Sequence, residues 1–318
     1  MNLRTKTIPT GDPSRPPRRG RGSARLSGLL LFLLLAQVSP AAADWNSLVG
    51  RLAADGFDRR MVEALFTRPE VRFEPDAMAG KITALIRSRA DADSLAARMK
   101  NAVYRAYLTS WMVARARSYA RENRVVLKEI DARYGVPKEI VVSILLVETH
   151  LGENIGKKIV FNRLASMALH PDLEDLRPYL SSSLITPENW EYARRRCREK
   201  ADWAYAELKA LLQLADRYHL DPMTIRGSIY GAIGLCQFMP SNVFFYGVDA
   251  DQDGRIDLFA KHDALHSIAN YLRQHGWRKG MDRENQHRVI LTYNCSMAYA
   301  NTVLAVADKL QDRKRARP

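Results

Sequence analysis

Residues 134–152, YGVPKEIVVSILLVETHLG, set one carboxylate, Glu148, at the end of a strongly apolar run. Gly135 is suited to end a helix, because glycine adopts the left-handed conformation at a helix C-terminus without steric cost. Pro137 is suited to begin the next helix, because the first helical turn does not need a backbone N–H at that position. The stretch therefore predicts two consecutive helices, the second of them apolar and carrying Glu148.

The apolar helix predicts an unusual environment for Glu148. Val141, Ile144 and Leu145 precede it by seven, four and three residues, so the four side chains share one helical face. Burial of that face would desolvate the carboxyl group and raise its pKa, as a general acid working near neutral pH requires. The alternative is a carboxylate that turns into solvent before a cap at Gly152. Helical spacing alone does not separate these two interpretations.

Helical spacing also accounts for most of the remaining chain, whereas strand-like alternation is almost absent. Of the 318 residues, 47% are hydrophobic and 26% are charged, which is ordinary for a globular protein. We therefore expect a mainly α fold. The other predicted helices cover 45–52, 61–66, 98–134, 186–219, 263–275 and 285–311. The irregular segments 227–247 and 248–258 interrupt this pattern, and irregular segments commonly carry function in helical proteins.

The first 43 residues predict a targeting segment. Five arginines within 15–25 precede the apolar core LLLFLLL, and alanines at 41–43 offer a cleavage site. We expect a cleaved signal peptide, with an uncleaved N-terminal anchor as the alternative. The chain then divides into the leader 1–43, a single domain 44–311 and a basic tail 312–318.

The net charge of the chain indicates which classes of partner it favours. The net charge is +14, and removal of the leader leaves 42 basic and 34 acidic residues. A mildly basic exported protein suits an anionic polymer such as a cell wall, or a membrane surface. Export argues against nucleic acid as a partner.

The chain has three cysteines, Cys197, Cys236 and Cys295, and no CxxC motif. An odd number cannot pair completely, so at least one thiol stays free even in an oxidising compartment. We interpret all three as small, mostly buried side chains rather than as metal ligands or nucleophiles.

The glycine-rich segment GSIYGAIGLCQFMPS (227–241) does not match the GxGxxG pattern of dinucleotide sites, and no predicted strand precedes it. Glycines at this density allow the backbone to approach a packed helix or a ligand closely. Ser228 and Gln237 could donate hydrogen bonds to a sugar, and Phe238 could offer an apolar face. By itself, the segment does not define a ligand.

The next segment, DADQDGRI (249–256), matches the opening of an EF-hand calcium loop. Aspartates at positions 1, 3 and 5 converge on one cation, and the glycine at position 6 permits the sharp turn. Position 12 is Ala260 rather than glutamate, but Asp263 could complete a longer loop. We therefore predict a structural calcium site, with an acidic turn without metal as the alternative. His262 and His266 lack a third ligand, and we interpret them as a solvated helix face.

Four segments, in this order, resemble the lytic murein transglycosylases of the membrane-bound transglycosylase B type. Residues 134–152 are similar to the catalytic-helix signature of that family, and 227–241 to its GSxxGAMGxGQFMPS block. VDADQDGRIDLF and DALHSIANYLRQHGW (263–277) are similar to its calcium loop and following helix, and TYNCSMAYANTVLAVADKL (292–310) to its closing YNxSxxYA segment. The resemblance runs through most of 57–310. It implies a lysozyme-like catalytic core with additional N-terminal helices and an EF-hand-like calcium loop (249–263).

The resemblance also implies roles for the matching positions. Glu148 would be the single catalytic acid and base. An aromatic residue from the N-terminal helices approaches the acid in the family, and the spacing leaves Tyr104 and Tyr107 as alternatives. The positions that line the saccharide groove are Ser228, Gln237, Phe238, Tyr271, Tyr293, Asn294 and Tyr299. The calcium ligands are Asp249, Asp251, Asp253, Arg255 through its carbonyl, and Asp263.

Two cysteines depart from the family pattern. Cys236 stands where the family usually has glycine, and Cys295 lies between two groove positions. A disulfide between them is one hypothesis.

The implied activity cleaves the β-1,4 bond between N-acetylmuramic acid and N-acetylglucosamine of peptidoglycan and leaves 1,6-anhydromuramyl ends. A lysozyme-type peptidoglycan hydrolase and a non-catalytic wall-binding protein are the alternatives. The expected partners are peptidoglycan glycan strands, with other cell-wall enzymes as further candidates. Calcium is the expected structural cofactor, and none is expected for catalysis. The resemblance implies a monomer in the periplasm of a Gram-negative bacterium, either free or associated with the membrane.

Overall fold

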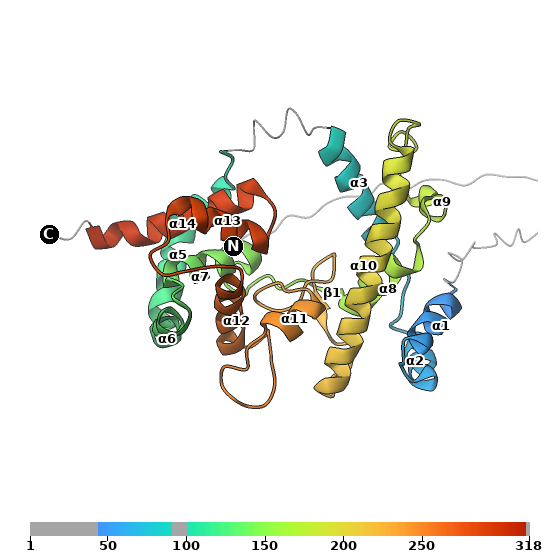
Figure 1. Ribbon diagram of the computed structural model, residues 1–318, viewed down its shortest axis with the longest axis horizontal. Coiled ribbons are helices and arrows are strands. Elements are labelled where there is room, and N and C mark those ends of the chain that lie inside the picture. Colours follow the sequence, from blue (N-terminus) through green and yellow to red (C-terminus); the bar gives the residue numbers. More distant parts are fainter. Residues whose placement is uncertain (1–43, 91–100, 316–318) are drawn as a thin grey trace, which may run out of the picture. The chain divides into compact units, whose positions relative to one another are not determined.

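The computed structural model describes residues 44–90 and 101–315, and within them the protein is mainly helical, as predicted (Figure 1). These residues belong to one compact unit. The predicted leader 1–43 lies outside the described residues. The helices in chain order are α1 (Asn46–Ala54), α2 (Arg59–Phe66), α3 (Asp76–Ala90), η1 (Arg105–Leu108), α5 (Ser110–Glu122), α6 (Arg124–Tyr134), α7 (Lys138–Thr149), α8 (Val160–Leu169), α9 (Leu173–Leu176), η2 (Arg177–Tyr179), α10 (Trp190–Arg217), α11 (Pro240–Tyr246), α12 (Lys261–Gln274), α13 (Arg283–Tyr293) and α14 (Met297–Arg315).

The apolar segment forms helix α7, which begins directly after Pro137. Every residue from Ile140 to Val147 is buried, because α5, α6, α12 and α14 all pack against this helix. Burial therefore extends around the helix instead of along the single face that the spacing predicted. A helix that is apolar on all sides is one that the core surrounds. From Ile140 onward, Glu148 is the one residue of α7 that keeps partial exposure.

A closed turn ends α7 before Gly152. The backbone N–H groups of His150 and Leu151 donate to the carbonyls of Leu146 (3.0 Å) and Leu145 (3.2 Å). This pattern closes the last turn in the manner of a Schellman motif. His150 and Leu151 both have positive φ values, 53° and 67°, in the region that favours glycine. The helix therefore ends two residues earlier than a cap at Gly152 would require.

The N-terminal helices pack onto the long helix α10 and its neighbour α8. Helix α1 contacts α2 and α8, and α3 contacts both α8 and α10. Figure 1 shows α8 and α10 side by side. Asp58 explains the start of α2, because its side chain accepts a 2.7 Å hydrogen bond from the backbone N–H of Met61. The buried apolar side chains of the predicted helices 45–52 and 61–66 are Leu48, Val49, Leu52, Val62, Leu65 and Phe66.

Two predicted helices are wrong in their continuity. The region 101–134 contains η1, α5 and α6 instead of one helix, because Thr109 caps α5 and Asn123 leaves helical geometry before α6. Gly135 ends α6 with a φ of 68°, as predicted. The region 285–311 is likewise split into α13 and α14 at residues 294–296. Helix α14 then continues to Arg315, so part of the predicted tail 312–318 is helical.

A small antiparallel sheet joins two distant parts of the chain. Strand β1 (Lys158–Ile159) pairs with β2 (Arg226–Gly227), and Gly227 and Phe238 each form a further bridge with Ile233. The backbone of the glycine-rich segment is thus fixed against the residues that follow α7. Within the described ranges, no helix is both long and apolar enough to cross a membrane.

Gly156 is the position where this junction tolerates no side chain. Its φ is 88°, and a Cβ atom there would lie 2.0 Å from the carbonyl oxygen of Gly227. Gly156→Ala should therefore lower the free energy of unfolding by about 3 kcal/mol or more, because backbone atoms on both sides must move. Thermal and denaturant unfolding would measure this loss.

Gly56→Ala is the matched control, because Gly56 has a φ of 94° but no atom within 4 Å of the place that a Cβ would occupy. It should cost only the left-handed conformation, about 1–2 kcal/mol. Equal losses at the two positions would show that the contact between Gly156 and Gly227 is unimportant.

Candidate active site

Glu148 lies in the last turn of α7 and is held by one hydrogen bond. The hydroxyl of Tyr299, from α14, donates to Oε1 of Glu148 at 2.6 Å. Burial raises the pKa of Glu148 from 4.5 to about 7, and the Tyr299 hydrogen bond acts in the opposite direction by stabilising the carboxylate. The side chain is therefore held inside the protein and does not turn freely into solvent.

An aromatic cluster surrounds this pair. Tyr293 stacks on Tyr299 with ring centroids 6.5 Å apart, and its hydroxyl donates to the Cys236 carbonyl at 2.6 Å. Tyr271 lies 4.9 Å from Tyr293, and its hydroxyl donates to the carbonyl of Thr292 at 2.6 Å. Burial is the main cause that raises the pKa of Tyr293 and Tyr299 well above its usual value, so both phenols stay neutral donors. The cluster therefore joins α12, α13 and α14 to the glycine-rich segment beside the acid.

Phe238 belongs to this cluster but does not present a face to solvent. Its side chain is only 2% exposed, and its ring packs between Tyr271 (5.7 Å) and Tyr293 (5.8 Å). The expectation that Phe238 offers an apolar face to a sugar is therefore wrong in this structure. The Phe238 ring instead packs against the two tyrosines inside the cluster.

The expected polar groove residues lie in two turns. In residues 227–232, here named the Ser228 turn, Ser228 Oγ accepts hydrogen bonds from the backbone N–H groups of Tyr230 (3.3 Å) and Ala232 (3.0 Å). In residues 294–296, here named the Asn294 turn, the exposed Asn294 accepts from the Ser296 N–H at 3.2 Å. The structure thus places Asn294 next to the aromatic cluster, whereas the Ser228 hydroxyl serves the backbone of its own turn.

Gln237 has a different task from the one expected. Its side-chain amide donates to the carbonyls of Gly234 (2.9 Å) and Ile155 (3.3 Å), and its own φ is 52°. The N–H groups that could serve a sugar are therefore engaged in holding a strained turn. Gln237 fixes the glycine-rich segment to the loop after α7.

Of the two aromatic alternatives from the N-terminal part, Tyr107 contacts the end of α7 next to the acid. Tyr107 donates to the carbonyl of Val147 at 3.2 Å and stacks on His150 at 5.3 Å. Burial and then the charge of Glu148 raise the pKa of Tyr107, which places the two side chains close together. Tyr104, 42% exposed, shares a 3.3 Å hydrogen bond with Ser296. His150 was not predicted, although its place two residues after Glu148 was the available signal.

The predicted calcium loop (249–263), here named the acidic loop, brings three of the expected calcium ligands together. Asp249, Asp251 and Asp263 each offer a carboxylate oxygen, and these oxygens lie within 4.8 Å of one another. Asp263 is almost fully buried and accepts from the backbone N–H groups of Ala250 and Asp257. Asp253 is outside this trio and accepts from the Arg255 N–H at 2.8 Å. Three oxygen donors this close fit a hard cation, because they otherwise repel each other.

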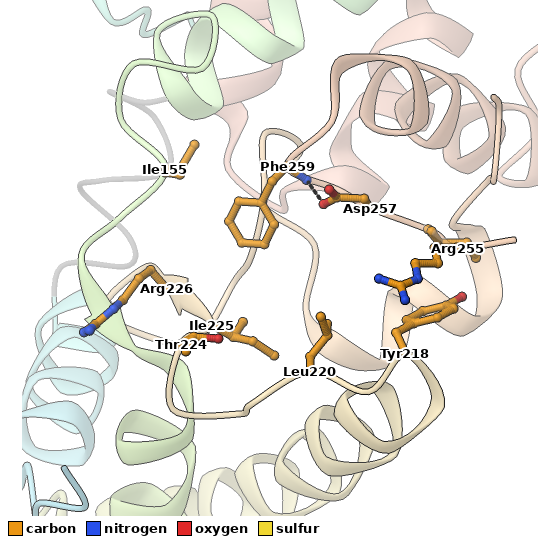
Figure 2. A pocket seen from close by; sticks show the side chains of 10 residues that line it. Ile155, Tyr218, Leu220, Thr224, Ile225, Arg226, Arg255, Asp257 and Phe259 are labelled. Atoms are coloured by element: carbon orange, nitrogen blue, oxygen red, sulfur yellow. Dashed lines mark hydrogen bonds between the residues drawn. The ribbon is translucent and has the colours of Figure 1, made fainter. Parts of the chain in front are cut away.

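A cavity of about 440 Å³ lies where the acidic loop meets residues 218–226 (Figure 2). Phe259, Leu220 and Ile225 form its apolar wall, and Arg226 and Arg255 lie at opposite sides of it. The acidic loop also contacts the glycine-rich segment directly, because the Leu235 N–H donates to the Leu258 carbonyl at 2.8 Å. A shift of the acidic loop would therefore move the backbone of the glycine-rich segment, which contains the turn that Gln237 holds.

Two further expectations need correction. His266 is 5% exposed and hydrogen-bonds to the Tyr134 hydroxyl at 3.2 Å, so it is not part of a solvated face, whereas His262 is exposed. All three cysteines are free, and Cys236 and Cys295 do not pair. Cys197 and Cys236 are buried as expected, but Cys295 is exposed in the Asn294 turn.

These features define a helical protein with a desolvated carboxyl group, Glu148, at the end of its central helix and an acidic loop suited to a cation. Residues 41–285 match the model of the Transglycosylase SLT domain family. Since this match covers most of the chain, the protein belongs to that family.

Individual relatives agree with this assignment. The chain is 37% identical over 147 residues to membrane-bound lytic murein transglycosylase B of Escherichia coli (strain K12), a match that covers 46% of this chain and 34% of that protein. The chain thus spans about a third of the length of this curated relative.

Solved structures share the fold. The Escherichia coli lytic transglycosylase Slt35 in complex with bulgecin A superposes with a TM-score of 0.65 at 20% identity, over 86% of this chain and 96% of that one. The same enzyme in complex with calcium gives 0.63 at 21% identity, again over 86% and 96%. Soluble lytic transglycosylase SltB1 of Pseudomonas aeruginosa gives 0.62 at 23% identity, over 85% and 99%.

The hydrogen bond from Tyr299 makes a direct prediction for the titration of Glu148. Tyr299→Phe removes a donor that stabilises the carboxylate, so the pKa of Glu148 should rise above its present value of about 7. Carbon NMR of the labelled Glu148 carboxyl across a pH series would measure the change.

Tyr293→Phe is the matched control, because its hydroxyl donates to a backbone carbonyl and not to Glu148. An unchanged or lower pKa in Tyr299→Phe would contradict the assigned hydrogen bond.

Proposed function

We propose that the protein is a lytic transglycosylase that cleaves the β-1,4 bond between N-acetylmuramic acid and N-acetylglucosamine in peptidoglycan. One observation carries the proposal: a carboxyl group in the last turn of a buried helix, held by Tyr299, whose pKa of about 7 keeps much of it protonated near neutral pH. Membership of the Transglycosylase SLT domain family supports the choice of substrate.

A single carboxyl group suffices for this chemistry. Protonated Glu148 donates its proton to the glycosidic oxygen as the bond from that oxygen to the muramyl anomeric carbon breaks. The carboxylate that results takes the proton of the muramyl 6-hydroxyl, whose oxygen forms a bond to the same anomeric carbon. The product is a 1,6-anhydromuramyl end, and Glu148 is again protonated. Desolvation serves both steps of the reaction. It keeps Glu148 protonated before the first step, and it makes the carboxylate a stronger base in the second.

The proposed route differs from that of an ordinary hydrolase in the number of carboxyl groups that it needs. Glycosidases of the usual kind use two carboxyl groups about 5–9.5 Å apart. The proposed route needs only Glu148, whose pKa is set by burial and by the Tyr299 hydroxyl. The positive charge that develops at the anomeric carbon is then met by neutral polar groups, for which Asn294 and Ser228 are the candidates, and by the N-acetyl group of the substrate.

Glu148→Gln tests the assignment. Loss of the proton donor should lower the rate of glycan release from purified peptidoglycan by roughly 10²- to 10⁴-fold. In the unaltered protein, activity should fall as pH rises through about 7, because only protonated Glu148 begins the reaction. Mass spectrometry of the wild-type products should give anhydro ends, one water lighter than hydrolysed ends.

Glu153→Gln is the matched control, since Glu153 is an exposed carboxylate five residues further on that pairs with Arg115. Products with reducing ends would point to the hydrolase, and unchanged degradation by Glu148→Gln would remove Glu148 from the catalytic role. A wild type without any activity would favour a wall-binding protein.

We further propose that the acidic loop binds calcium as a structural ion. Asp249, Asp251 and Asp263 supply the convergent oxygens, and Asp253 and the Arg255 carbonyl are the remaining candidate ligands. The calcium-bound structure of the related Slt35 supports this choice of ion. The ion would fix the loop that contacts the glycine-rich segment through Leu235 and Leu258.

Calcium should raise the melting temperature of the protein. A ligand present at a hundred times its Kd stabilises the folded state by about 2.7 kcal/mol, which corresponds to a rise of several degrees for a domain of this size. Scanning calorimetry with calcium, magnesium or chelator would measure the shift, and Asp251→Asn should abolish it.

Asp216→Asn, an exposed aspartate on α10, should respond to calcium as the unaltered protein does. Equal stabilisation of Asp251→Asn and the unaltered protein would argue for an acidic turn without metal.

The setting of the enzyme follows from the same function. We propose that it acts as a monomeric domain, residues 44–311, on glycan strands in the periplasm of a Gram-negative bacterium after export by the segment 1–43. Other cell-wall enzymes are its further candidate partners.

A further inference from the structure

A group of basic side chains lies beside the Ser228 turn. Lys81 of α3 places its ammonium group 4.4 Å from the ring centroid of Tyr230, in the Ser228 turn. The Tyr230 hydroxyl in turn lies 3.8 Å from where a Cβ on Gly80 would be. The first half of α3 is thus packed on the Ser228 turn, and Lys81 sits at their contact.

The packing of α3 on α10 brings two more cations to the same place. Arg89 lies 4.4 Å over the ring of Tyr192, and the Tyr192 hydroxyl bonds to the Leu85 carbonyl at 3.5 Å. Lys81 lies one helical turn before Leu85 on α3. On α10, the positions one and two turns beyond Tyr192 are Arg196 and Lys200. The contact between α3 and α10 therefore brings together three cations, here named the basic seam: Lys81, Arg196 and Lys200.

The cations of the basic seam act on one another. Burial is the main cause that lowers the pKa of Lys81, and the charge of Lys200 lowers it further. The contact of Lys81 with the Tyr230 ring places the seam at the Ser228 turn, which contains one of the expected groove residues.

Acidic side chains neutralise only part of this seam. Glu199 pairs with Arg196 at 2.5 Å and with Arg195 at 3.7 Å. Lys81 and Lys200 have no ion pair among the described residues, although both are only partly exposed. Like charges that are held together in a partly desolvated place raise the free energy of the protein unless an anion joins them.

The Ser228 turn on which Lys81 rests is itself fixed. Arg163 is 1% exposed, and its Nε donates to the Ile229 carbonyl at 2.7 Å while its Nη1 pairs with Glu74 and Asp76. Ile229 remains 53% exposed beside Lys81 and Tyr230. The seam therefore borders a rigid surface that offers cations, an aromatic ring and an exposed aliphatic side chain.

We propose that Lys81 and Lys200, with Arg196 behind them, bind the carboxylates of the peptide stem that the muramyl sugar carries. This inference rests on the proposed function, because it assumes that a glycan strand lies at Glu148. A stem peptide combines several carboxylates with alanyl methyl groups, which suits cations next to an exposed isoleucine and a tyrosine ring. The basic seam would then favour strands with peptides over bare glycan.

Binding to a protein without turnover tests the inference directly. In a Glu148→Gln background, calorimetry at low salt would compare N-acetylglucosaminyl-N-acetylmuramyl-tetrapeptide with the same disaccharide without peptide. Lys81→Gln and Lys200→Gln should each weaken binding of the peptide form about 2- to 5-fold, the range of single partly exposed ion pairs, and the double variant about 5- to 20-fold. The bare disaccharide should show no matching loss. Higher salt should reduce the difference between the two ligands.

Lys128→Gln, an exposed lysine on α6 without an ion pair among the described residues, controls for net charge. Equal weakening for both ligands, or no weakening for either, would overturn the inference. A wild type that releases no anhydro products from purified peptidoglycan would instead overturn the proposed function, and the binding comparison would still decide whether the basic seam recognises the stem.

Discussion

The burial of α7 on all sides is the constraint on which the rest of the structure depends. Four helices, α5, α6, α12 and α14, cover it, and Glu148 near its C-terminal end is the carboxyl group that this helix carries into the core. A buried carboxylate without partners would be costly, and the Tyr299 hydroxyl limits that cost without neutralising the group. The same packing that makes the core stable therefore sets the pKa of the candidate acid.

The glycine-rich segment is the second element that this core controls. Its backbone is tied to β1 by strand pairing, to the loop after α7 by Gln237, to Tyr293 by the Cys236 carbonyl and to the acidic loop by Leu235. These ties come from three parts of the chain: residues 155–159, Tyr293 and the acidic loop. Glycine at 156 and 227 is what lets two of these backbones meet at van der Waals distance. The site is thus assembled from backbone contacts as much as from side chains.

Much of this arrangement could be predicted from the sequence, for reasons that particular residues show. The helical class and the end of α6 at Gly135 follow from local patterns of apolar and turn residues. Helical spacing left the environment of Glu148 open, and the packing of four helices around α7 is what raises its pKa. The breaks at Thr109 and at residues 294–296 could not be predicted, because apolar spacing continues across them and tertiary contacts decide where the helix stops. Phe238, Gln237 and His266 were misplaced for the same reason. Spacing indicates that a side chain lies near a site, but only packing determines whether it faces the ligand or supports the residue that does.

The strand pair β1–β2 has a consequence for how the chain can vary. It closes residues 160–225 into a loop, because the Val160 N–H bonds to the Ile225 carbonyl at 3.1 Å and the paired strands lie just outside these residues. Both ends of this excursion, which carries α8, α9 and α10, are therefore pinned next to each other. Lengthening of its exposed connection near residues 181–183 would add little to the closure entropy. The excursion can accordingly change its size in related proteins while the junction that supports the glycine-rich segment keeps its geometry.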